Sequence, residues 1–436
     1  MNKYKQIYVL GIGGSGMSSI AKYLIQQNKN VVGYDQRKSF ITNQLNQDGI
    51  HVDFDLTNLK YSKETLYIYS SAISIQGTSL KNYINNENIL SRPEFLSVLS
   101  KENKIIGITG THGKTSTTAL LAHIFHYNEI NVSYIFGGIT SFHGIGGHYG
   151  DEDQPIILET DEAFNTFKDI DIDDLLVTNI DVDHLDFFQS FNNLIKAFKH
   201  VIENVKGNLV LNYDDKNLRE LNIKKNMVKY SSSDETDMRI KYPNKVIIEN
   251  NEYLIDTKLI GSHFISNITG AIALAILNGI KVEEALEAIK TFPGVKRRTE
   301  YLGSINGIKV YDDYGHHPTE ILATITALQE HTLGKLYVVF QPHRYTRTQN
   351  SFREFKEALS KAYQTVVVDI YPAGEKPIPG VSSKNFEHEN IKYLKSMRMV
   401  PSYLLGRVKE NDVILTLGAG DITLLGPQIL KYLDEI

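Results

Sequence analysis

The chain contains the stretch Ile105-Ile-Gly-Ile-Thr-Gly-Thr-His-Gly-Lys-Thr-Ser116, in which an apolar, β-branched run passes directly into a glycine turn. A helical pattern of apolar residues follows as far as His126. A glycine loop between a strand and a helix presents backbone N–H groups to phosphate, and Lys114 and Thr115 are the residue types that bind β/γ-phosphates and magnesium. The loop departs from the strict phosphate-loop pattern, because Ile108 stands where that pattern has glycine. The essential parts are present, and we predict an ATP site at this turn.

The same order of strand, glycine turn and helix occurs at two other places. Near the start, Ile7–Leu10 is followed by Gly11-Ile-Gly-Gly-Ser-Gly16, and near the end, Val413–Leu417 is followed by Gly418-Ala-Gly-Asp421. Such alternation predicts parallel sheets with crossover helices. A chain of 436 residues has room for about three domains of about 150 residues each. We therefore expect an α/β protein of three domains.

Composition excludes several classes of function. Apolar residues make up 42% and charged residues 22%, and the net charge is -5, which argues against a general nucleic-acid or membrane-surface binder. The absence of cysteine excludes disulfides, thiolate nucleophiles and cysteine-ligated metal centres. No apolar run approaches the length of a membrane span, and no signal-peptide cleavage site is visible. We expect a cytoplasmic, multi-domain protein that binds no nucleic acid and no membrane.

The first glycine motif suits a diphosphate. Gly11, Gly13 and Gly16 follow a strand and open a helix, and Asp35 ends the next strand, Val31–Asp35, where an acid can bind a ribose hydroxyl. One interpretation is a dinucleotide dehydrogenase domain, and another is a glycine turn that only packs a helix on a sheet. Because nothing downstream resembles a hydride-transfer site, the motif indicates a diphosphate rather than a nicotinamide cofactor.

Acidic residues follow two predicted strands near the phosphate loop. Ile156–Leu158 is followed by Glu159-Thr-Asp-Glu162, and Leu175–Asn179 is followed by Ile180-Asp-Val-Asp-His184. Acids at the carboxyl ends of strands are placed to hold Mg²⁺, which takes oxygen ligands. His184 among them suggests a second, phosphate-bridging metal. A solvated acidic loop is the alternative.

A third group of polar residues follows two strands near the C-terminus. The stretch Tyr311-Asp-Asp-Tyr-Gly-His-His-Pro-Thr-Glu320 holds adjacent histidines, and Gln341-Pro-His-Arg-Tyr-Thr-Arg347 follows the strand Leu336–Phe340. Adjacent histidines do not share one chelating face, and no third metal ligand is evident. The combination of histidine and arginine suits carboxylate or phosphate groups better.

Together these motifs make the chain similar to the Mur ligases, the ATP-dependent amide ligases of peptidoglycan precursor synthesis. The resemblance runs from end to end. It is carried by Gly11-Ile-Gly-Gly-Ser-Gly-Met17, Ser70-Ser-Ala-Ile73, Arg92-Pro-Glu-Phe-Leu96, Gly110–Thr115, Thr178-Asn-Ile180 with Asp183-His184, Gly294-Val-Lys-Arg-Arg298, Asp312–Glu320, Gln341–Arg347 and Leu417-Gly-Ala-Gly-Asp421.

The resemblance implies three α/β domains. A Rossmann-like N-terminal domain, residues 1–101, would bind a UDP-sugar, and a central P-loop domain of the mononucleotide-binding ATPase type, residues 102–298, would bind ATP. A Rossmann-like C-terminal domain, residues 299–436, would bind the amino acid. The implied reaction adds L-alanine to UDP-N-acetylmuramate through an acyl phosphate, with ATP and Mg²⁺, and yields ADP and phosphate. The first glycine motif is thereby assigned to the UDP diphosphate instead of NAD.

The resemblance also implies roles for individual residues. The catalytic set is Lys114, Glu159, His184, His316 and Arg344. The metal ligands are Thr115, Glu159 and His184. The ATP site comprises Gly110, Thr111, His112, Gly113, Lys114, Thr115, Ser116, Asn267, Arg298 and Asp313. The UDP-sugar site comprises Gly11, Gly13, Gly14, Ser15, Gly16, Asp35, Ser70 and Ser71. The wall that faces the amino acid and phosphate comprises Tyr314, His316, His343, Arg344 and Arg347.

The chain departs from the family pattern at a few positions. Ala163 and Phe164 replace a serine and the following acid, and Phe264 stands where the family often has asparagine before Asn267. Lys199, after His184, could correspond to the carbamylated lysine of sister ligases or be an ordinary helix lysine. Three alternatives stay open: a Mur-type ligase with another acceptor or amino acid, an NAD-dependent oxidoreductase, and a non-catalytic nucleotide-binding regulator.

Overall fold

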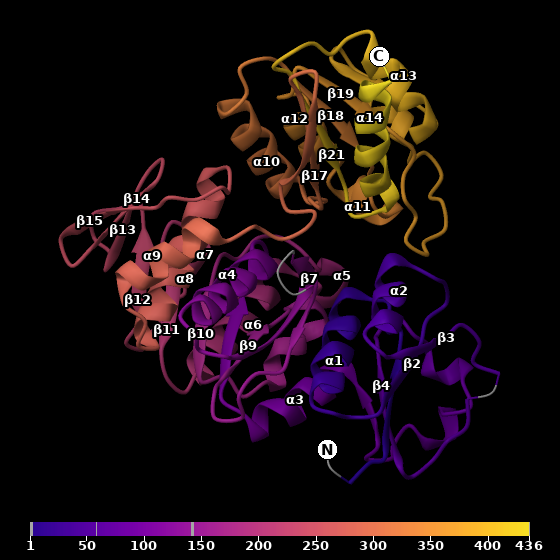
Figure 1. The fold of residues 1–436 in the computed structure, drawn as a ribbon, viewed down its shortest axis with the longest axis vertical. Coiled ribbons are helices and arrows are strands. Elements are labelled where there is room, and N and C mark those ends of the chain that lie inside the picture. The colour runs from indigo at the N-terminus through magenta and orange to yellow at the C-terminus, as the bar shows by residue number, and fades with distance from the viewer. Residues whose placement is uncertain (1–2, 58, 141–143, 436) are drawn as a thin grey trace. The chain divides into compact units, whose positions relative to one another are not determined.

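The structure, a computed structural model, describes residues 3–57, 59–140 and 144–435. The chain forms two compact units: the first runs to Lys258 and resumes over Ile265–Pro293, and the second comprises Leu259–Phe264 and the chain from Gly294 onward. Three sheets are present, two in the first unit and one in the second (Figure 1). This arrangement confirms the predicted three-domain α/β fold class.

The N-terminal sheet is parallel throughout, with strand order β3-β2-β1-β4-β5. Ile7 and Val9 of β1 pack against the helices, whereas Tyr8 and Leu10 face the loops on the other side. Strand order reverses at β1, so the glycine turn after it lies at the switch point where α/β sheets bind ligands. The elements are β1 (Gln6–Leu10), α1 (Ser15–Gln26), β2 (Val31–Tyr34), α2 (Phe40–Gln47), β3 (His51–Asp53), β4 (Thr65–Tyr69), η1 (Ile75–Gly77), η2 (Lys81–Tyr83), β5 (Ile89–Ser91) and α3 (Arg92–Glu102).

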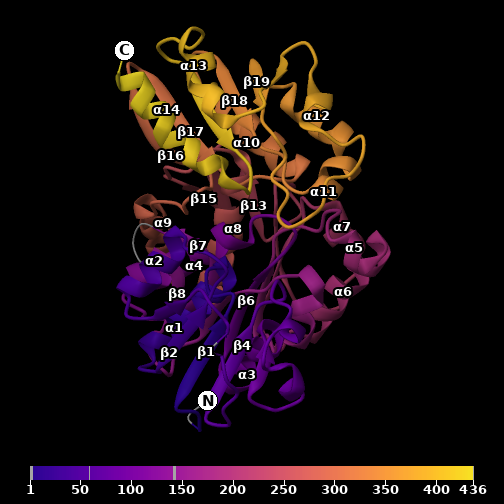
Figure 2. The ribbon, with the colours of Figure 1, turned by 90° about the vertical axis from the view of Figure 1, so that its right-hand side faces the viewer.

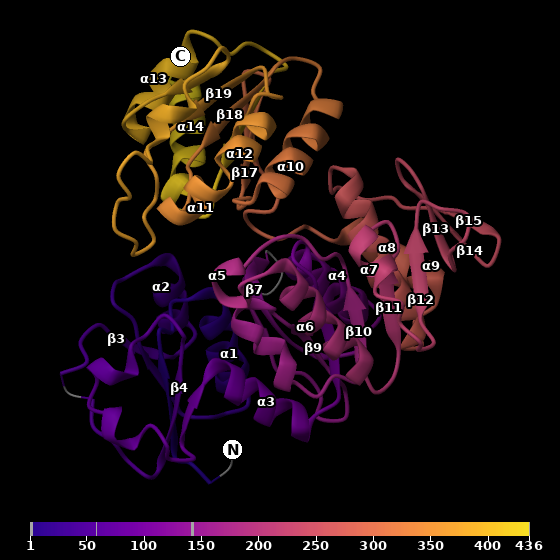
Figure 3. The same ribbon diagram turned by 180° about the vertical axis from the view of Figure 1, so that it is seen from behind.

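The central sheet has ten strands in the order β15-β14-β13-β12-β11-β10-β6-β9-β7-β8. Its middle is parallel, and antiparallel pairs extend it at both edges, with β13 to β15 at the edge visible in Figure 3. Because β6 lies between β9 and β10, the acids after those two strands reach the same edge as the phosphate loop. The strands are β6 (Ile105–Thr109), β7 (Ser133–Thr140), β8 (Gly144–His148), β9 (Ile156–Glu159), β10 (Asp174–Val177), β11 (Leu209–Asn212), β12 (Val228–Ser231), β13 (Met238–Lys241), β14 (Lys245–Ile248) and β15 (Asn251–Leu254).

Helices cover both faces of the central sheet. The helix α6 buries Leu194, Phe198 and Ile202, and the Phe198 ring meets that of Phe167 edge-on at 5.1 Å between centroids. On the other face, Gly270 of α8 lies against Leu176, where a side chain would clash. The helices are α4 (Lys114–Tyr127), η3 (Ala163–Asp169), α5 (Leu185–Phe188), α6 (Phe191–Asn204), α7 (Lys216–Glu220), α8 (Ser262–Leu277) and α9 (Val282–Thr291).

The second unit is built on a six-stranded sheet in the order β16-β17-β21-β18-β19-β20, parallel except for the predicted hairpin β16–β17. Apolar residues of α10 and α12 cover one face, and those of α13 and α14 cover the other (Figure 2). The strands are β16 (Glu300–Ile305), β17 (Ile308–Asp313), β18 (Leu336–Phe340), β19 (Gln364–Val367), β20 (Ile391–Tyr393) and β21 (Val413–Leu417). The helices are α10 (Pro318–Glu330), α11 (Tyr345–Asn350), α12 (Phe352–Leu359), η4 (Ser383–Phe386), η5 (Met397–Met399), α13 (Val400–Leu405), η6 (Asp421–Leu424) and α14 (Leu425–Asp434).

The two predicted domain boundaries lie near the ends of secondary-structure elements. The boundary after residue 101 lies in the last turn of α3, three residues before β6 begins at Ile105. The boundary after residue 298 lies between α9 and β16, where Arg297 and Thr299 have positive φ angles of 62° and 47°. The domain limits themselves stay predictions. Within the described residues, no helix has the length and apolar character needed to cross a membrane.

Candidate active site

The predicted UDP-sugar residues converge at the carboxyl edge of the N-terminal sheet. Gly11 has a φ of 79°, and a Cβ there would lie 3.0 Å from the Cβ of Ser70. Gly13 donates its N–H to Oδ2 of Asp35 at 2.9 Å. Asp35 therefore closes the glycine loop as well as standing at the end of β2. Gly14 precedes α1 as its N-cap, in extended conformation.

The first turn of α1 reaches the central sheet within the same unit. Ser19 donates its hydroxyl to the carbonyl oxygen of Phe136 in β7 at 2.6 Å, and this bond is buried. The hydroxyl of Ser15 and the carboxylate of Glu159 would lie 3.3 and 3.6 Å from a Cβ on Gly137. The structure thus places the start of α1 beside the predicted metal ligand Glu159.

Arg92, the first residue of α3, lies against the same turn of α1. A Cβ on Gly16 would be 2.9 Å from its Nε and 3.1 Å from its Nη2, so a side chain there would displace the guanidinium. This Nε is buried and has no hydrogen-bond partner among the described residues. Arg92 also helps to lower the pKa of Asp161, although burial opposes that shift. We did not assign Arg92 from the sequence, although it opens one of the family motifs.

The phosphate loop has the backbone form that its sequence predicts. Gly110 and Gly113 have φ angles of 132° and 83°, and a Cβ on Gly110 would overlap the hydroxyl of Thr178. Lys114 donates from Nζ to the carbonyl oxygens of Gly110 at 2.6 Å and Thr111 at 3.1 Å. These bonds hold the lysine over its own loop.

Lys114 also forms a buried ion pair. Its Nζ lies 2.8 Å from Oε2 of Glu162, whose side chain is only 1% exposed, and 3.9 Å from Oδ1 of Asp161. Burial alone would lower the pKa of Lys114, but Glu162, Asp161 and Glu159 outweigh it and raise that pKa. The lysine is therefore charged. Glu162 is a residue that we did not single out, because three acids, Glu159, Asp161 and Glu162, lie at the end of β9 and just after it, and the sequence does not say which of them turns inward.

Thr115 and Glu159, two predicted metal ligands, lie together. The Thr115 hydroxyl donates to Oε1 of Glu159 at 2.8 Å, and the Gly137 N–H donates to Oε2 at 2.6 Å. His184, the third predicted ligand, lies close to Glu162 instead: its Nε2 is 3.9 Å from Oε1 of Glu162. One ligand atom each from Asp161, Glu162 and His184 falls within 4.8 Å of the others.

These side chains fit a divalent cation. Oε1 of Glu162 is buried without a hydrogen-bond partner among the described residues, which is costly unless a ligand compensates. Burial also raises the pKa of Glu162 to about 7. Carboxylate oxygens are the donors that magnesium prefers. Thr115 and Glu159 could hold one ion, and His184 with Asp161 and Glu162 a second.

Other predicted ATP residues pack around the loop. The His112 N–H donates to Oδ1 of Asn179 at 2.9 Å, and its ring Nε2 lies 3.0 Å from Oδ2 of Asp181. Ser116 is buried in the first turn of α4. Asn267 of α8 contacts the loop directly, because a Cβ on Gly113 would lie 2.8 Å from its Oδ1. Lys199 is 42% exposed and pairs with Glu203 at 3.8 Å, as an ordinary helix lysine does.

In the second unit, Asp313 and Arg298 lie at the end of β17 and in the segment before β16. Asp313 is buried; it accepts N–H bonds from Thr299 at 2.6 Å and Gly315 at 2.7 Å. Burial raises its pKa to about 6. The guanidinium of Arg298 lies 5.1 Å from the ring centre of Tyr314, and that of the neighbouring Arg297 lies 4.9 Å from it.

The predicted amino-acid wall is assembled from two strand ends. The His316 ring lies 5.2 Å from that of Tyr314 and 5.9 Å from that of His343, which stacks on Tyr371 at 5.5 Å. Burial is the largest cause that lowers the pKa of His316 to about 3 and that of His343 to about 4. Arg347, on α11, adds to both shifts. Both imidazoles are therefore neutral near pH 7.

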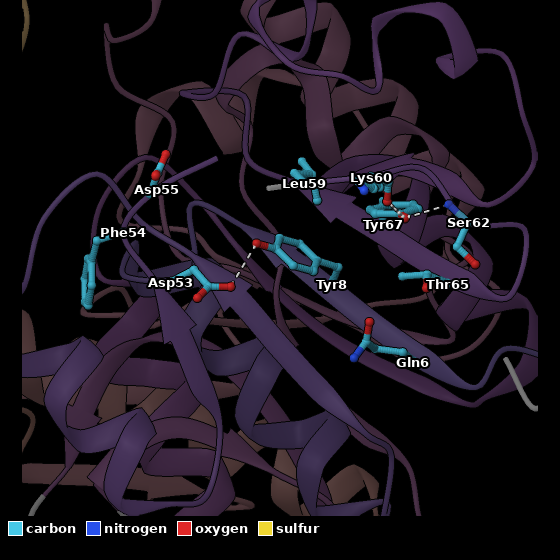
Figure 4. Close-up of a pocket in the computed structure, with 10 residues that line it drawn as sticks. All are labelled: Gln6, Tyr8, Asp53, Phe54, Asp55, Leu59, Lys60, Ser62, Thr65 and Tyr67. Carbon is cyan, nitrogen blue, oxygen red and sulfur yellow. Dashed lines mark hydrogen bonds between the residues drawn. The ribbon is translucent and has the colours of Figure 1, made fainter. Parts of the chain in front are cut away.

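A separate cavity of about 500 Å³ lies on the face of the N-terminal sheet opposite α1 (Figure 4). The Tyr8 hydroxyl there donates weakly to Oδ2 of Asp53 at 3.4 Å, and the Tyr67 hydroxyl donates to the carbonyl oxygen of Lys60 at 2.8 Å. None of the ten residues that line this cavity belongs to a predicted site. The chemistry-bearing residues lie at the carboxyl edges of the sheets instead.

Three family models match the chain in sequence. Residues 6–104 match the catalytic domain of the Mur ligase family, residues 108–275 the Mur ligase middle domain, and residues 297–420 the Mur ligase glutamate ligase domain. The chain belongs to the Mur ligase family. The three matches correspond in order to the three sheets described above.

Individual relatives are similar over nearly the whole chain. The UDP-N-acetylmuramate–L-alanine ligases of Geotalea daltonii and Bdellovibrio bacteriovorus are 34% and 32% identical, each over 99% of both chains. The crystal structure of a UDP-N-acetylmuramate–alanine ligase from Thermotoga maritima has a TM-score of 0.82 at 25% identity, over 98% of both chains.

The two neutral histidines predict a pH-dependent stability. Because the native pKa of His316 is about 3 and the unfolded value is about 6.5, the unfolded state binds a proton that the native state excludes between those pH values. Stability is therefore lost as pH falls from about 6.5. Groups that face His316 are Glu320, Arg347 and His343. When the pH is lowered from 7 to 5, the free energy of unfolding of His316→Asn should fall by about 1–2 kcal/mol less than that of the wild type. Thermal unfolding at each pH measures this difference.

The control for this measurement is His388→Asn, which changes an exposed histidine of the same unit. It should lose stability in parallel with wild type. If His316→Asn also follows the wild-type curve, the native imidazole is not held neutral by burial.

A second prediction concerns the cation site. His184→Ala should weaken Mn²⁺ binding in the presence of a non-hydrolysable ATP analogue by about tenfold or more, as loss of groups that support a metal typically does. The matched control is His200→Ala, on α6. Binding can be measured by electron paramagnetic resonance, and an unchanged Mn²⁺ titration would exclude His184 as a ligand.

Proposed function

We propose that this protein is an ATP-dependent ligase that joins L-alanine to UDP-N-acetylmuramate, with release of ADP and phosphate. The observation that carries the proposal is the phosphate loop, in which Lys114 and Thr115 face acids of β9, beside the glycine turn of α1. Ligases of that name are similar to the chain over its whole length. The two anion sites in one unit are what this reaction needs, because a nucleotide sugar and ATP must meet.

ATP would bind at the phosphate loop. The N–H groups at the start of α4 point toward the phosphates, and Lys114 exchanges Glu162 for the β/γ-phosphate oxygens. Thr115 and Glu159 would hold one Mg²⁺, and His184 with Asp161 and Glu162 a second. When bound, Mg²⁺ neutralises charge that develops on the transferring phosphoryl group.

The remaining ATP contacts come from outside the loop. Asn267, already against Gly113, is assigned to the adenine side, and Arg298 to the nucleotide phosphates. Asp313 is assigned to the ribose. Its Oδ2 accepts both the N–H and the hydroxyl of Thr299, whereas Oδ1 accepts the N–H of Gly315 and keeps a lone pair for a hydroxyl donor.

The nucleotide sugar would bind at the glycine turn of the N-terminal sheet. The free N–H groups and the positive dipole end of α1 suit its diphosphate. Arg92 adds a full positive charge at the same turn, with a buried Nε that has no hydrogen-bond partner in the part of the chain that the structure describes. We assign Arg92 to the diphosphate, together with the glycines, Ser15, Ser70 and Ser71.

The chemistry then proceeds in two steps. A carboxylate oxygen of the muramoyl group attacks the γ-phosphorus, the bond to the β-phosphate oxygen breaks, and ADP leaves. The amine of L-alanine attacks the acyl carbon of the resulting acyl phosphate and gives a tetrahedral intermediate. This intermediate loses phosphate as the amine loses a proton, which completes the amide. Because two anions must be brought together first, catalysis depends mainly on positioning and charge neutralisation.

The amino acid would be held by the wall in the second unit. Arg344 and Arg347 supply positive charge for its carboxylate and for phosphate, and His316 and His343 are neutral hydrogen-bonding groups at neutral pH. Tyr314 completes the wall. A pocket of this kind distinguishes one methyl group by only about 1–3 kcal/mol.

Phosphate release tests the proposal directly. With ATP, Mg²⁺ and UDP-N-acetylmuramate, L-alanine should stimulate release, and L-serine or glycine should do so less. A nicotinamide-dependent enzyme would show no such release, and a nucleotide-binding regulator would bind ATP without it. If no amino acid stimulates release, the proposal is wrong.

Lys114→Ala tests the phosphate loop. Loss of one electrostatic donor should reduce kcat by about 100-fold, or about 2–3 kcal/mol of transition-state stabilisation. The fold should be kept, because Glu162, with a pKa of about 7, can take up a proton when its partner is gone. Lys196→Ala, on the exposed side of α6, is the control. Wild-type turnover by a folded Lys114→Ala protein would show that the loop has another role.

A further inference from the structure

The loop that follows β19 is tied to the Arg344 segment at several points. The Arg344 N–H donates to the carbonyl oxygen of Tyr371 at 2.9 Å, and the Tyr371 N–H donates to that of Pro342 at 2.8 Å. The rings of His343 and Tyr371 stack almost parallel, at an interplanar angle of 8°. The backbone on both sides of Arg344 is therefore fixed by a segment about 30 residues further along the chain.

Arg344 has an unusual backbone conformation. Its φ is 71°, a region that residues with a Cβ rarely adopt unless neighbouring contacts enforce it. Arg344 is also the N-cap of α11. This conformation turns the chain between β18 and α11, so the direction of the side chain depends on the contacts that maintain it.

Glu375 holds the side chain of Arg344. Its Oε1 accepts from Nε of Arg344 at 2.6 Å and from the Thr346 hydroxyl at 2.6 Å, and its Oε2 accepts the Thr346 N–H at 3.0 Å. The side chain is 17% exposed. Burial opposes ionisation, but the bonds from Thr346 and Arg344 outweigh it and lower the pKa of Glu375. Glu375 is thus a charged group with all its described bonds directed at one turn.

The ion pair uses only one part of the guanidinium. Nε is bonded to Glu375, and the structure gives no protein acceptor to the two Nη atoms among the residues that it describes. A guanidinium carries five N–H donors in a rigid plane, so fixing Nε also fixes the direction of the Nη donors. The Nη pair is then oriented for an anion before that anion arrives.

We propose that Glu375 is a positioning residue, which orients Arg344 so that its Nη groups bind the carboxylate of the amino-acid substrate. This inference rests on the proposed function, which places Arg344 in the wall facing the amino acid. Glu375 does not itself touch the substrate carboxylate, because like charges would repel. Its effect is to reduce the side-chain entropy that Arg344 loses when the amino acid binds.

The test compares Glu375→Gln and Glu375→Asp with a control, Glu387→Gln. Glu387 is a carboxylate of the same unit that pairs with Lys392 at 2.9 Å. Phosphate release is measured while L-alanine, ATP and UDP-N-acetylmuramate are varied in turn. Binding of L-alanine in the presence of the nucleotide sugar and a non-hydrolysable ATP analogue is measured by calorimetry.

Both Glu375 variants should raise KM for L-alanine at least tenfold and weaken its binding to a similar extent. The KM values for ATP and UDP-N-acetylmuramate should stay within twofold of wild type. Glu375→Asp, which keeps the charge, should be affected less than Glu375→Gln. Thr346→Ala, which removes only one hydroxyl donor to Glu375, should leave KM for L-alanine nearly unchanged. The melting temperatures of the variants and the control should agree.

An unchanged KM for L-alanine in both Glu375 variants would overturn the inference, as would an equal rise in all three KM values. Arg344→Ala separates this failure from that of the proposed function. If Arg344→Ala raises KM for L-alanine and the Glu375 variants do not, only the role of Glu375 is wrong. If Arg344→Ala has no effect either, Arg344 does not face the amino acid and both assignments are wrong.

Discussion

The buried ion pair between Lys114 and Glu162 is the interaction on which the centre of the first unit depends. A lysine held inside a phosphate loop needs an anion, since an unpaired buried charge is far more costly than a paired one. In this chain the anion is Glu162, which lies three residues after the end of β9, the strand that pairs with β6. The parallel pairing of β6 with β9 is what brings the two groups together. Sheet register and electrostatics therefore support each other.

Under the proposed function, the partner of Lys114 would change when ATP binds. Glu162 pairs with Lys114 in this structure, and phosphate oxygens of ATP would take its place. Glu162 would then require another partner. Its Oε1 is buried without a hydrogen-bond partner among the described residues and lies near His184. The two glutamates at this end of β9 thus have different partners. Glu159 is bonded to Thr115 and Gly137, while Glu162 is bonded to Lys114.

Positive charge in this protein is placed locally. With a net charge of -5, the chain cannot attract a nucleotide sugar and ATP by its overall field. Lys114 and Arg92 lie in the first unit, each beside the start of a helix whose dipole adds to its charge. Arg298, Arg344 and Arg347 lie in the second unit. Each of these cations, apart from Lys114, is an arginine, whose planar group suits carboxylate and phosphate.

The architecture and most residues of the candidate site were predictable from local sequence patterns. Strands such as Ile105–Thr109, Leu336–Phe340 and Val413–Leu417 were predicted to the residue, because an apolar run that ends in a glycine turn or in polar residues is a local signal. The glycine motifs likewise predicted two anion sites from local sequence. Motif resemblance then supplied the reaction, which local patterns alone left open between a ligase, a dehydrogenase and a regulator.

Which charged groups contact each other depends on long-range packing, which local sequence does not reveal. Lys114 and Glu162 are 48 residues apart, and Arg344 and Glu375 are 31 residues apart. Whether Glu159, Asp161 or Glu162 faces the lysine depends on how the chain turns after β9, and no local pattern fixes that turn. Arg92 likewise meets Gly16 because α1 and α3 share one apolar core with β1. Local periodicity specifies elements, whereas long-range packing specifies the partners of their charges.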